Sequence, residues 1–217
     1  MSGHPPADLR AVVFDCDGLL LDTESRWTIA ETALFERYGG SFGPEEKRML
    51  LGSSMLEAGR LLERVLDAPG QAERLAEELL DLAVAELPGA EPMVGAIELV
   101  KELSGDMSLG LATNSVRRLI EPVLAETGAA ELFDVVIAGD DVERAKPAPD
   151  IYLEMCRRLG VRPDQAIALE DSPNGVAAAR SAGLFVIGVS SLEGVTLEAN
   201  VVAPSLLDEG VRRALGL

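Results

Sequence analysis

The stretch from Val12 to Glu24 reads VVFDCDGLLLDTE, and it leads from an apolar run to two aspartates separated by one residue. The apolar residues that begin at Ala11 predict a short buried strand. An unpaired carboxylate is costly to bury, so Asp15 and Asp17 need a positively charged partner at the end of that strand. The stretch therefore places a candidate site directly after the first strand.

The composition indicates a globular protein with one substantial core. The chain has 217 residues, of which 47% are hydrophobic and 26% are charged. Its formal net charge of -18 makes nucleic acid and anionic membranes poor partners. No apolar run approaches the roughly 20 residues that span a bilayer, and the first residues lack the pattern of a secretory signal. We therefore expect a cytoplasmic protein; the oligomeric state is left open, with a monomer as the simplest case.

The scarcity of histidine and cysteine excludes several kinds of site. The only histidine is His4, close to the N-terminus, so a site that depends on a catalytic or zinc-binding histidine is not expected. Cys16 and Cys156 lie far apart in apolar settings and indicate neither a disulfide nor a CxxC site. Acid and base chemistry must then come from Asp, Glu, Lys or Tyr, and a metal site would be rich in oxygen, which points to magnesium or calcium.

The periodicity of apolar residues divides the chain into two kinds of structure. Residues 24–87 show a helical pattern, whereas strands and helices alternate after Pro88-Gly89. The expected strands are 11–14, 107–112, 135–138, 166–169 and 185–189, with 201–202 as an edge strand. The alternation predicts an α/β fold, a doubly wound parallel sheet of the Rossmann type. We expect a catalytic core of residues 1–21 and 89–217, and an inserted α-helical cap of residues 22–88 that lies over the site.

Polar residues follow each of the central strands that the pattern predicts. Ligands bind beyond the carboxyl ends of the strands in such sheets, so these residues are expected to meet at one edge. Taken singly, each group has a simpler interpretation as a turn, a strand end, an exposed loop or a helix cap. Four groups converging at one edge favour a site. They are Asp15 and Asp17, then Thr113, Asn114 and Ser115, then Lys146, and finally Glu170 and Asp171.

These four groups resemble, in order and spacing, the four motifs of the haloacid dehalogenase-like hydrolase superfamily. The resemblance covers nearly the whole chain, including the position of a helical cap. The sequences FDCDGLLLDTE, KPAPDIY and LEDSPNG further resemble the branch that holds sugar-phosphate phosphatases and β-phosphoglucomutase. The resemblance implies a Mg²⁺-dependent phosphatase whose partner is a small phosphorylated metabolite, plausibly a sugar phosphate.

The resemblance also implies a role for each motif residue. Asp15 would be the nucleophile that forms an aspartyl phosphate, and Asp17 would be the general acid and base. Cys16 between them would point away from the site, because neighbouring strand residues face opposite ways. The phosphoryl oxygens would be bound by Thr113, Asn114, Ser115 and Lys146. The Mg²⁺ ion would be held by Asp15, by the backbone carbonyl of Asp17 and by Asp171, with Glu170 acting through a water.

The helical insertion is less informative. Trp27 is most simply a core anchor, and it stands where the mutase branch tends to carry histidine. Arg26, Lys47, Arg48 and Arg60 could reach a distal anion on a substrate, although each is more simply a solvated charge on a helix face. The loop at residues 51–54 is a candidate substrate-reading loop. The cap is net acidic, so no broad basic surface for a large polyanion is expected.

Two other functions compete with a phosphatase. A phosphomutase would use the same residues but return the phosphoryl group to a sugar hydroxyl, and Trp27 argues weakly against it. A phosphoaccepting signalling receiver also combines aspartates with Thr and Lys. However, receivers carry the phosphoaccepting aspartate on a later strand, whereas Asp15 follows the first. Dehalogenase and phosphonate-cleaving activities are disfavoured by the aspartate at position 17.

Overall fold

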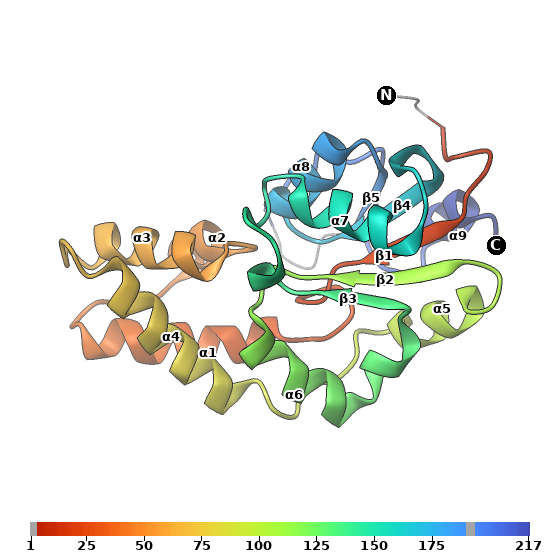
Figure 1. Cartoon of the computed structure of the whole chain (residues 1–217). Coiled ribbons are helices and arrows are strands. Elements are labelled where there is room, and N and C mark those ends of the chain that lie inside the picture. Colours follow the sequence, from red (N-terminus) through yellow and green to blue (C-terminus); the bar gives the residue numbers. More distant parts are fainter. Residues whose placement is uncertain (1–3, 190–193) are drawn as a thin grey trace.

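The structure, a computed structural model, describes residues 4–189 and 194–217. Its centre is a parallel sheet of six strands in the order β3-β2-β1-β4-β5-β6 (Figure 1). The strands are β1 (Ala11–Phe14), β2 (Ser108–Ala112), β3 (Val135–Ile137), β4 (Ala166–Glu170), β5 (Phe185–Val189) and β6 (Val201–Ala203). The predicted doubly wound α/β core is confirmed, and β1 lies in the middle of the sheet.

The inner strands are apolar on both faces because helices cover both sides of the sheet. Val12 and Phe14 pack into one cluster, and Ala11 and Val13 pack into the other. The first cluster includes residues of α5 (Ala96–Leu103), α6 (Arg117–Thr127) and α9 (Glu209–Leu215). The second includes residues of α7 (Asp150–Leu159) and α8 (Pro173–Ala182). Short 3₁₀ turns lie at Ala129–Leu132, Gly139–Asp141 and Pro163–Gln165.

Four helices lie between β1 and α5 in the chain. They are α1 (Glu24–Arg37), α2 (Pro44–Leu50), α3 (Met55–Val65) and α4 (Ala72–Glu86). Figure 1 shows them grouped beyond one end of the sheet, on the side toward which β1 runs. Helix α4 packs against both α1 and α3, and Leu75, Leu79 and Ala83 form its buried face. Every helix within the described part of the chain is too short or too polar to cross a lipid bilayer.

The two connections between the sheet and these helices run side by side. The Asp22 N–H donates to the Glu91 carbonyl at 2.8 Å, and the Met93 N–H donates to the Leu20 carbonyl at 2.9 Å. Arg26 on α1 reinforces the junction, because its guanidinium donates to a backbone carbonyl of Gly89 at 3.3 Å. We therefore propose the division expected from the sequence, with residues 22–88 as a cap domain on a core of residues 1–21 and 89–217.

The observed boundaries differ from the expected ones by one or two residues. Strand β4 continues to Glu170, because the parallel pairing with β5 extends to Gly188. Helix α1 begins at Glu24, where the helical pattern of the sequence also begins. Met107 lies outside β2 and forms a bridge with Ser104 instead.

Candidate active site

The polar residues that follow the central strands meet at one end of the sheet. Asp15 comes directly after β1, and its N–H donates to the Leu169 carbonyl of β4 at 3.0 Å. Thr113 follows β2 in the same way, with its N–H on the Ile137 carbonyl of β3 at 3.1 Å. The pairing of the strands thus fixes both positions. The buried members of the group are Asp15, Thr113, Asn114, Ser115, Lys146, Glu170 and Asp171.

Lys146 is the positive partner of the buried carboxylates. Its Nζ lies 2.6 Å from Asp15 Oδ1 and 2.5 Å from Glu170 Oε1, and it also donates to the Ala112 carbonyl at 2.9 Å. The lysine side chain is only 2% exposed. Burial alone favours the neutral amine, but the carboxylates of Asp15 and Glu170 raise the pKa of Lys146 well above its ordinary value. Lys146 therefore carries a fixed positive charge beside Asp15.

Asn114 positions the backbone of Lys146. Its Oδ1 accepts the Lys146 N–H at 2.8 Å, and its Nδ2 donates to the Lys146 carbonyl at 3.0 Å. The same Nδ2 donates to the Gly52 carbonyl at 2.9 Å, in the loop between α2 and α3. Asn114 therefore links the lysine to the helical insertion. Its predicted contact with phosphoryl oxygens stays a prediction.

Asp17 is held by four donors. Thr23 Oγ1 and Trp27 Nε1 donate to Oδ1 at 2.9 and 3.2 Å. Thr113 Oγ1 and Ser115 Oγ donate to Oδ2 at 2.8 and 2.9 Å. Two of these donors come from the strand end after β2, whereas Trp27 lies on α1. The carboxylate is thus oriented by both the sheet and the insertion.

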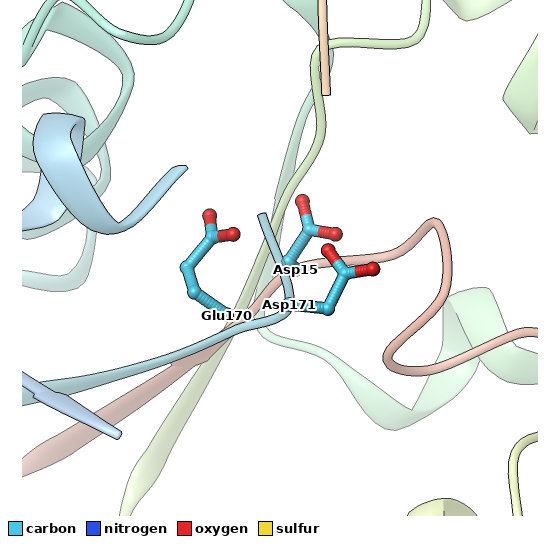
Figure 2. A group of neighbouring side chains, drawn as sticks. All are labelled: Asp15, Glu170 and Asp171. Carbon is cyan, nitrogen blue, oxygen red and sulfur yellow. The ribbon is translucent and has the colours of Figure 1, made fainter. Parts of the chain in front are cut away.

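Three acidic side chains form a cluster that suits a metal ion. Asp15, Glu170 and Asp171 each offer a carboxylate oxygen, and these atoms all lie within 4.8 Å of one another. Figure 2 shows the carboxyl groups of Asp15 and Asp171 side by side, with that of Glu170 turned to the other side. Burial, with Glu170 and Asp17 nearby, holds the pKa of Asp15 well above its ordinary value despite Lys146. One lysine therefore does not balance the crowded carboxylates, and an all-oxygen set of this kind fits a hard divalent cation.

The segment after β1 also approaches the acidic cluster closely. Gly18 has a φ of +80°, and a Cβ built there would lie 2.3 Å from Asp171 Oδ2. Only glycine fits that backbone beside the carboxylate. The Asp17 side chain is not part of the cluster, since its oxygens accept the four hydrogen bonds described above. The predicted contribution of its backbone carbonyl stays a prediction.

Cys16 lies on the opposite side of the segment from Asp15, as expected. Its side chain is fully buried in the same apolar cluster as Val12 and Phe14. Burial, with the nearby Asp17 and Asp15 charges, raises the pKa of its thiol well above the ordinary value. A protonated, buried thiol of this kind is chemically inert.

A pocket lies between the strand ends and the insertion. The strand-end residues that line it are Asp15, Asp17, Asn114, Ser115, Lys146, Asp171 and Ser172. From the insertion, Leu51, Gly52 and Ser53 of the candidate substrate-reading loop line it as well. The empty space between them, open solvent included, is about 630 Å³.

The structure shows which basic residues of the insertion line the pocket, a distinction that the sequence alone did not provide. Lys47 lines the pocket, where it forms ion pairs with Glu24 at 2.7 Å and Glu31 at 3.0 Å. Arg48 and Arg60 are exposed and do not line this pocket. Arg26 donates to backbone carbonyls at the junction described above.

Sequence reasoning missed three further contributions to the site. Thr23 was assigned no role, and Trp27 was interpreted as a core anchor, yet both donate to Asp17. Tyr152 is fully buried on α7, its hydroxyl donates to Glu170 Oε1, and its ring centroid lies 5.2 Å from Lys146 Nζ. The KPAPDIY motif contains this tyrosine two residues into the helix, so the motif itself was the available signal.

Comparisons with known proteins agree with this geometry. A family model described as haloacid dehalogenase-like hydrolase matches residues 12–189. The chain is 35% identical over 185 residues to validoxylamine A 7'-phosphate phosphatase of Streptomyces hygroscopicus subsp. limoneus, which covers 84% of this chain and 86% of the relative. It is 30% identical over 181 residues to the fructose-1-phosphate phosphatase YqaB of Escherichia coli, covering 83% and 96%.

A solved structure shows the same architecture. The β-phosphoglucomutase of Clostridium difficile superimposes with a TM-score of 0.82 at 25% sequence identity, covering 96% of this chain and 97% of that one. The fold and the arrangement of the helical insertion are therefore shared with a phosphomutase as well as with phosphatases.

Proposed function

The chain belongs to the haloacid dehalogenase-like hydrolase family, in the β-phosphoglucomutase-like branch, and within that family of phosphoric monoester hydrolases we propose that it is a Mg²⁺-dependent phosphatase acting through an aspartyl phosphate. The observation that carries the proposal is the meeting of Asp15, Lys146 and Asp171 around one point. These residues are up to 156 positions apart in the sequence. The structural requirements of a strand end do not explain why all three side chains meet.

Asp15 is the proposed nucleophile. Its carboxylate oxygen attacks phosphorus, the bond from phosphorus to the ester oxygen breaks, and Asp17 gives that oxygen a proton as the alcohol leaves. Water then attacks phosphorus, Asp17 takes its proton, and the acyl phosphate bond breaks to release inorganic phosphate and restore Asp15. Lys146 holds a positive charge beside the transferring group throughout.

The metal ion would be held by Asp15 and Asp171, with Glu170 close by. When bound, Mg²⁺ supplies a positive charge that draws the phosphoryl group to Asp15 and stabilises the charge of the transition state. Around it, the residues of the chain exclude water and fix the carboxylates. Asn114 keeps Lys146 in position, and Ser115 and Thr113 keep Asp17 in position, in addition to their predicted contacts with phosphoryl oxygens.

The proposed substrate is a small phosphorylated metabolite of the sugar-phosphate kind. The two phosphatases compared above are named for a validoxylamine 7'-phosphate and a fructose 1-phosphate. Both names describe a phosphate on a small molecule, and one of the two is a sugar phosphate. The pocket lies against the strand ends that carry Asp15 and Asp17.

A phosphomutase is the second candidate, because the likeness to β-phosphoglucomutase covers nearly the whole chain. Trp27 argues against it. The indole N–H that faces Asp17 donates a hydrogen bond but cannot take up or release a proton as an imidazole would. This chain therefore offers Asp17 as the single acid and base at that point of the pocket, which suffices for hydrolysis.

The test is phosphate release from p-nitrophenyl phosphate and from a panel of sugar monophosphates. We expect turnover with Mg²⁺, none in excess EDTA, and recovery when Mg²⁺ is restored. Asp15→Asn keeps the side-chain volume but removes the nucleophile, so we expect a loss of at least about 10³-fold with an unchanged circular dichroism spectrum. Asp106→Asn, at an exposed aspartate, is the matched control. Full turnover in EDTA or in Asp15→Asn would contradict the proposal, and an isomerised sugar phosphate would favour the mutase.

A further inference from the structure

The pocket has a second group of charged side chains, which comes from the cap. Glu24 and Glu31 on α1 and Lys47 on α2 line it together with Asp15 and Asp17. Glu24 and Glu31 are seven residues apart, which places them on the same face of α1. None of the three has a role in the hydrolysis described above.

The three charged side chains are largely buried, and two acidic groups face one lysine. The side chains of Lys47, Glu24 and Glu31 are 12%, 15% and 6% exposed. Lys47 Nζ hydrogen-bonds Glu31 Oε2 at 3.0 Å and lies 2.7 Å from Glu24 Oε2. One cation thus faces two carboxylates. A buried cluster of this kind is weak evidence for a stabilising role, because desolvation offsets the attraction between the charges.

One oxygen of the cluster can accept a further hydrogen bond. Among the described residues, Glu24 Oε2 is the single buried side-chain N or O atom without a hydrogen bond, although it lies close to Lys47. The 2.7 Å ion pair with Lys47 already neutralises this oxygen, and a carboxylate oxygen keeps a second lone pair that can accept from a further donor. Because it lines the pocket, an O–H of a bound molecule is a suitable donor.

The cations that line the pocket are already paired with carboxylates and are not free to bind a second anion of a substrate. Within the part of the chain that the structure describes, Lys47 and Lys146 are the two cations that line the pocket, and each is paired with two carboxylates. A second phosphate at this cluster would lie against the carboxyl groups of Glu24 and Glu31 and would find no unpaired cation among the described pocket residues to bind it. A hydroxyl, in contrast, can donate to a carboxylate and accept from the ammonium.

Resting on the proposed function, we propose that Glu24, Glu31 and Lys47 bind hydroxyls of an uncharged polyol leaving group and discriminate against phosphoesters that carry a second anionic group. The apolar side chains of Met55, Ala58 and Leu79 beside the cluster would pack against the C–H faces of the same group. The substrate class is then the monophosphate of a sugar or of a sugar-like polyol, not a bisphosphate or a phosphorylated acid.

The experiment compares kcat/KM for a hexose monophosphate, the corresponding hexose bisphosphate and p-nitrophenyl phosphate, all with Mg²⁺. For the natural chain we expect the hexose monophosphate to be preferred over the bisphosphate by at least about tenfold. In Lys47→Met and in Glu31→Gln, the ratio of kcat/KM for hexose monophosphate to that for p-nitrophenyl phosphate should fall by at least about tenfold. Glu36→Gln and Arg48→Met, at exposed positions of the same two helices, should leave that ratio unchanged.

A direct binding measurement separates this inference from the proposed function. Calorimetry of Asp15→Asn with Mg²⁺ and the hexose monophosphate should show binding, and Asp15→Asn combined with Lys47→Met should bind about tenfold more weakly. Hydrolysis that prefers the bisphosphate, or an unchanged ratio in both variants, overturns the inference and leaves the phosphatase standing. Binding that depends on Lys47 without hydrolysis of any ester by the natural chain overturns the phosphatase alone. If the natural chain hydrolyses no ester and binding does not depend on Lys47, both the inference and the proposed phosphatase are overturned.

Discussion

At the scale of single residues, the site depends on which groups surround each carboxylate. Lys146 and Tyr152 both donate to Glu170 Oε1, so Glu170 is satisfied before any cation is bound. Burial, reinforced by the Glu170 charge, raises the pKa of the Tyr152 hydroxyl well above its ordinary value. The hydroxyl therefore stays protonated and acts as a donor that fixes the Lys146–Glu170 pair.

Tyr152→Phe should separate a positioning role from a merely structural one. The variant removes one donor from Glu170, so we expect the free energy of unfolding to fall by about 1–3 kcal/mol. Because Glu170 holds Lys146 beside Asp15, we also expect kcat to fall by roughly tenfold with a smaller change in KM. Tyr38→Phe is the control, since the Tyr38 hydroxyl donates to Glu78 within the cap. A loss of stability with kcat unchanged would reduce Tyr152 to a packing residue.

Glu31 should make stability depend on pH. Burial raises the pKa of its carboxyl from 4.5 to about 7, although Lys47 lies beside it. Between these values the folded protein holds a proton that the unfolded chain has lost, so the free energy of unfolding falls as the pH rises. We expect the difference in unfolding free energy between the natural chain and Glu31→Gln to shift by roughly 2–3 kcal/mol against the natural chain from pH 5 to pH 8. Urea unfolding at constant ionic strength measures both unfolding free energies at each pH. If they change with pH in parallel, the raised pKa of Glu31 is contradicted.

The sequence predicted the core residues of the site better than those of the insertion. Asp15, Lys146 and Asp171 follow apolar strands, and parallel strands end at one edge, so their meeting could be inferred. The partners of Lys47 could not, because a charge on an amphipathic helix is exposed or buried according to how the helices pack against the strand ends. The donors to Asp17 were hidden for the same reason, since Trp27 fits an apolar face as well as it fits a hydrogen bond.

At the scale of elements, the start of α8 is fitted tightly to the end of β4. Ser172 Oγ accepts the Gly175 N–H at 3.1 Å and so begins the helix. A Cβ built on Gly175 would lie 1.9 Å from Glu170 Oε2, inside the carboxylate. The first turn of the helix therefore approaches Glu170 as closely as it does because residue 175 has no side chain.

Gly175→Ala should disturb both stability and activity. The added methyl group must displace the Glu170 carboxylate or the helix, so we expect the free energy of unfolding to fall by about 1–3 kcal/mol. Phosphate release should fall with it, because Glu170 pairs with Lys146. Gly43→Ala, where the new methyl would meet only the end of the Glu46 side chain at 3.3 Å, is the matched control. Equal effects of the two variants would argue against a tight fit at Glu170.

The order of elements was predictable, but their ends were not. Apolar alternation identified the six strands, because the inner ones are buried on both faces. It ended β4 at Leu169, since a charged residue rarely continues a buried strand, and Glu170 does so here through its bonds to Lys146 and Tyr152. The local pattern carries no information about partners 18 and 24 residues away.

At the scale of the whole molecule, few hydrogen bonds join the cap to the strand ends across the pocket. The Gly52 carbonyl accepts from Asn114 at 2.9 Å and from Asn174 at 3.3 Å, and Trp27 donates to Asp17. At the surface, Arg118 on α6 forms ion pairs with Glu77 and Asp81 on α4, all exposed and so of small energy. The paired connections at Asp22 and Met93 are the place where we expect the cap to hinge.

We expect the cap to close on Mg²⁺ and a phosphate analogue and to open without them. Closure excludes water from the phosphoryl group, and few contacts must be broken to reverse it. Small-angle scattering should give a smaller radius of gyration with both ligands than with neither. Trp27, the only tryptophan of the chain, should change its fluorescence in parallel, because we expect its hydrogen bond to Asp17 to break when the cap opens. Identical scattering and fluorescence in the two conditions would contradict a moving cap.

The division of the pocket between two stretches of sequence has a practical consequence for protein engineering. The groups proposed to cleave the ester come from the ends of strands in the sheet, whereas Glu24, Glu31 and Lys47 come from helices of the cap. A randomised library confined to positions 24, 31 and 47 would explore new compounds and would leave Trp27 and its hydrogen bond to Asp17 unchanged. Selection for growth on unfamiliar phosphate sources would then reward changes in those helices first.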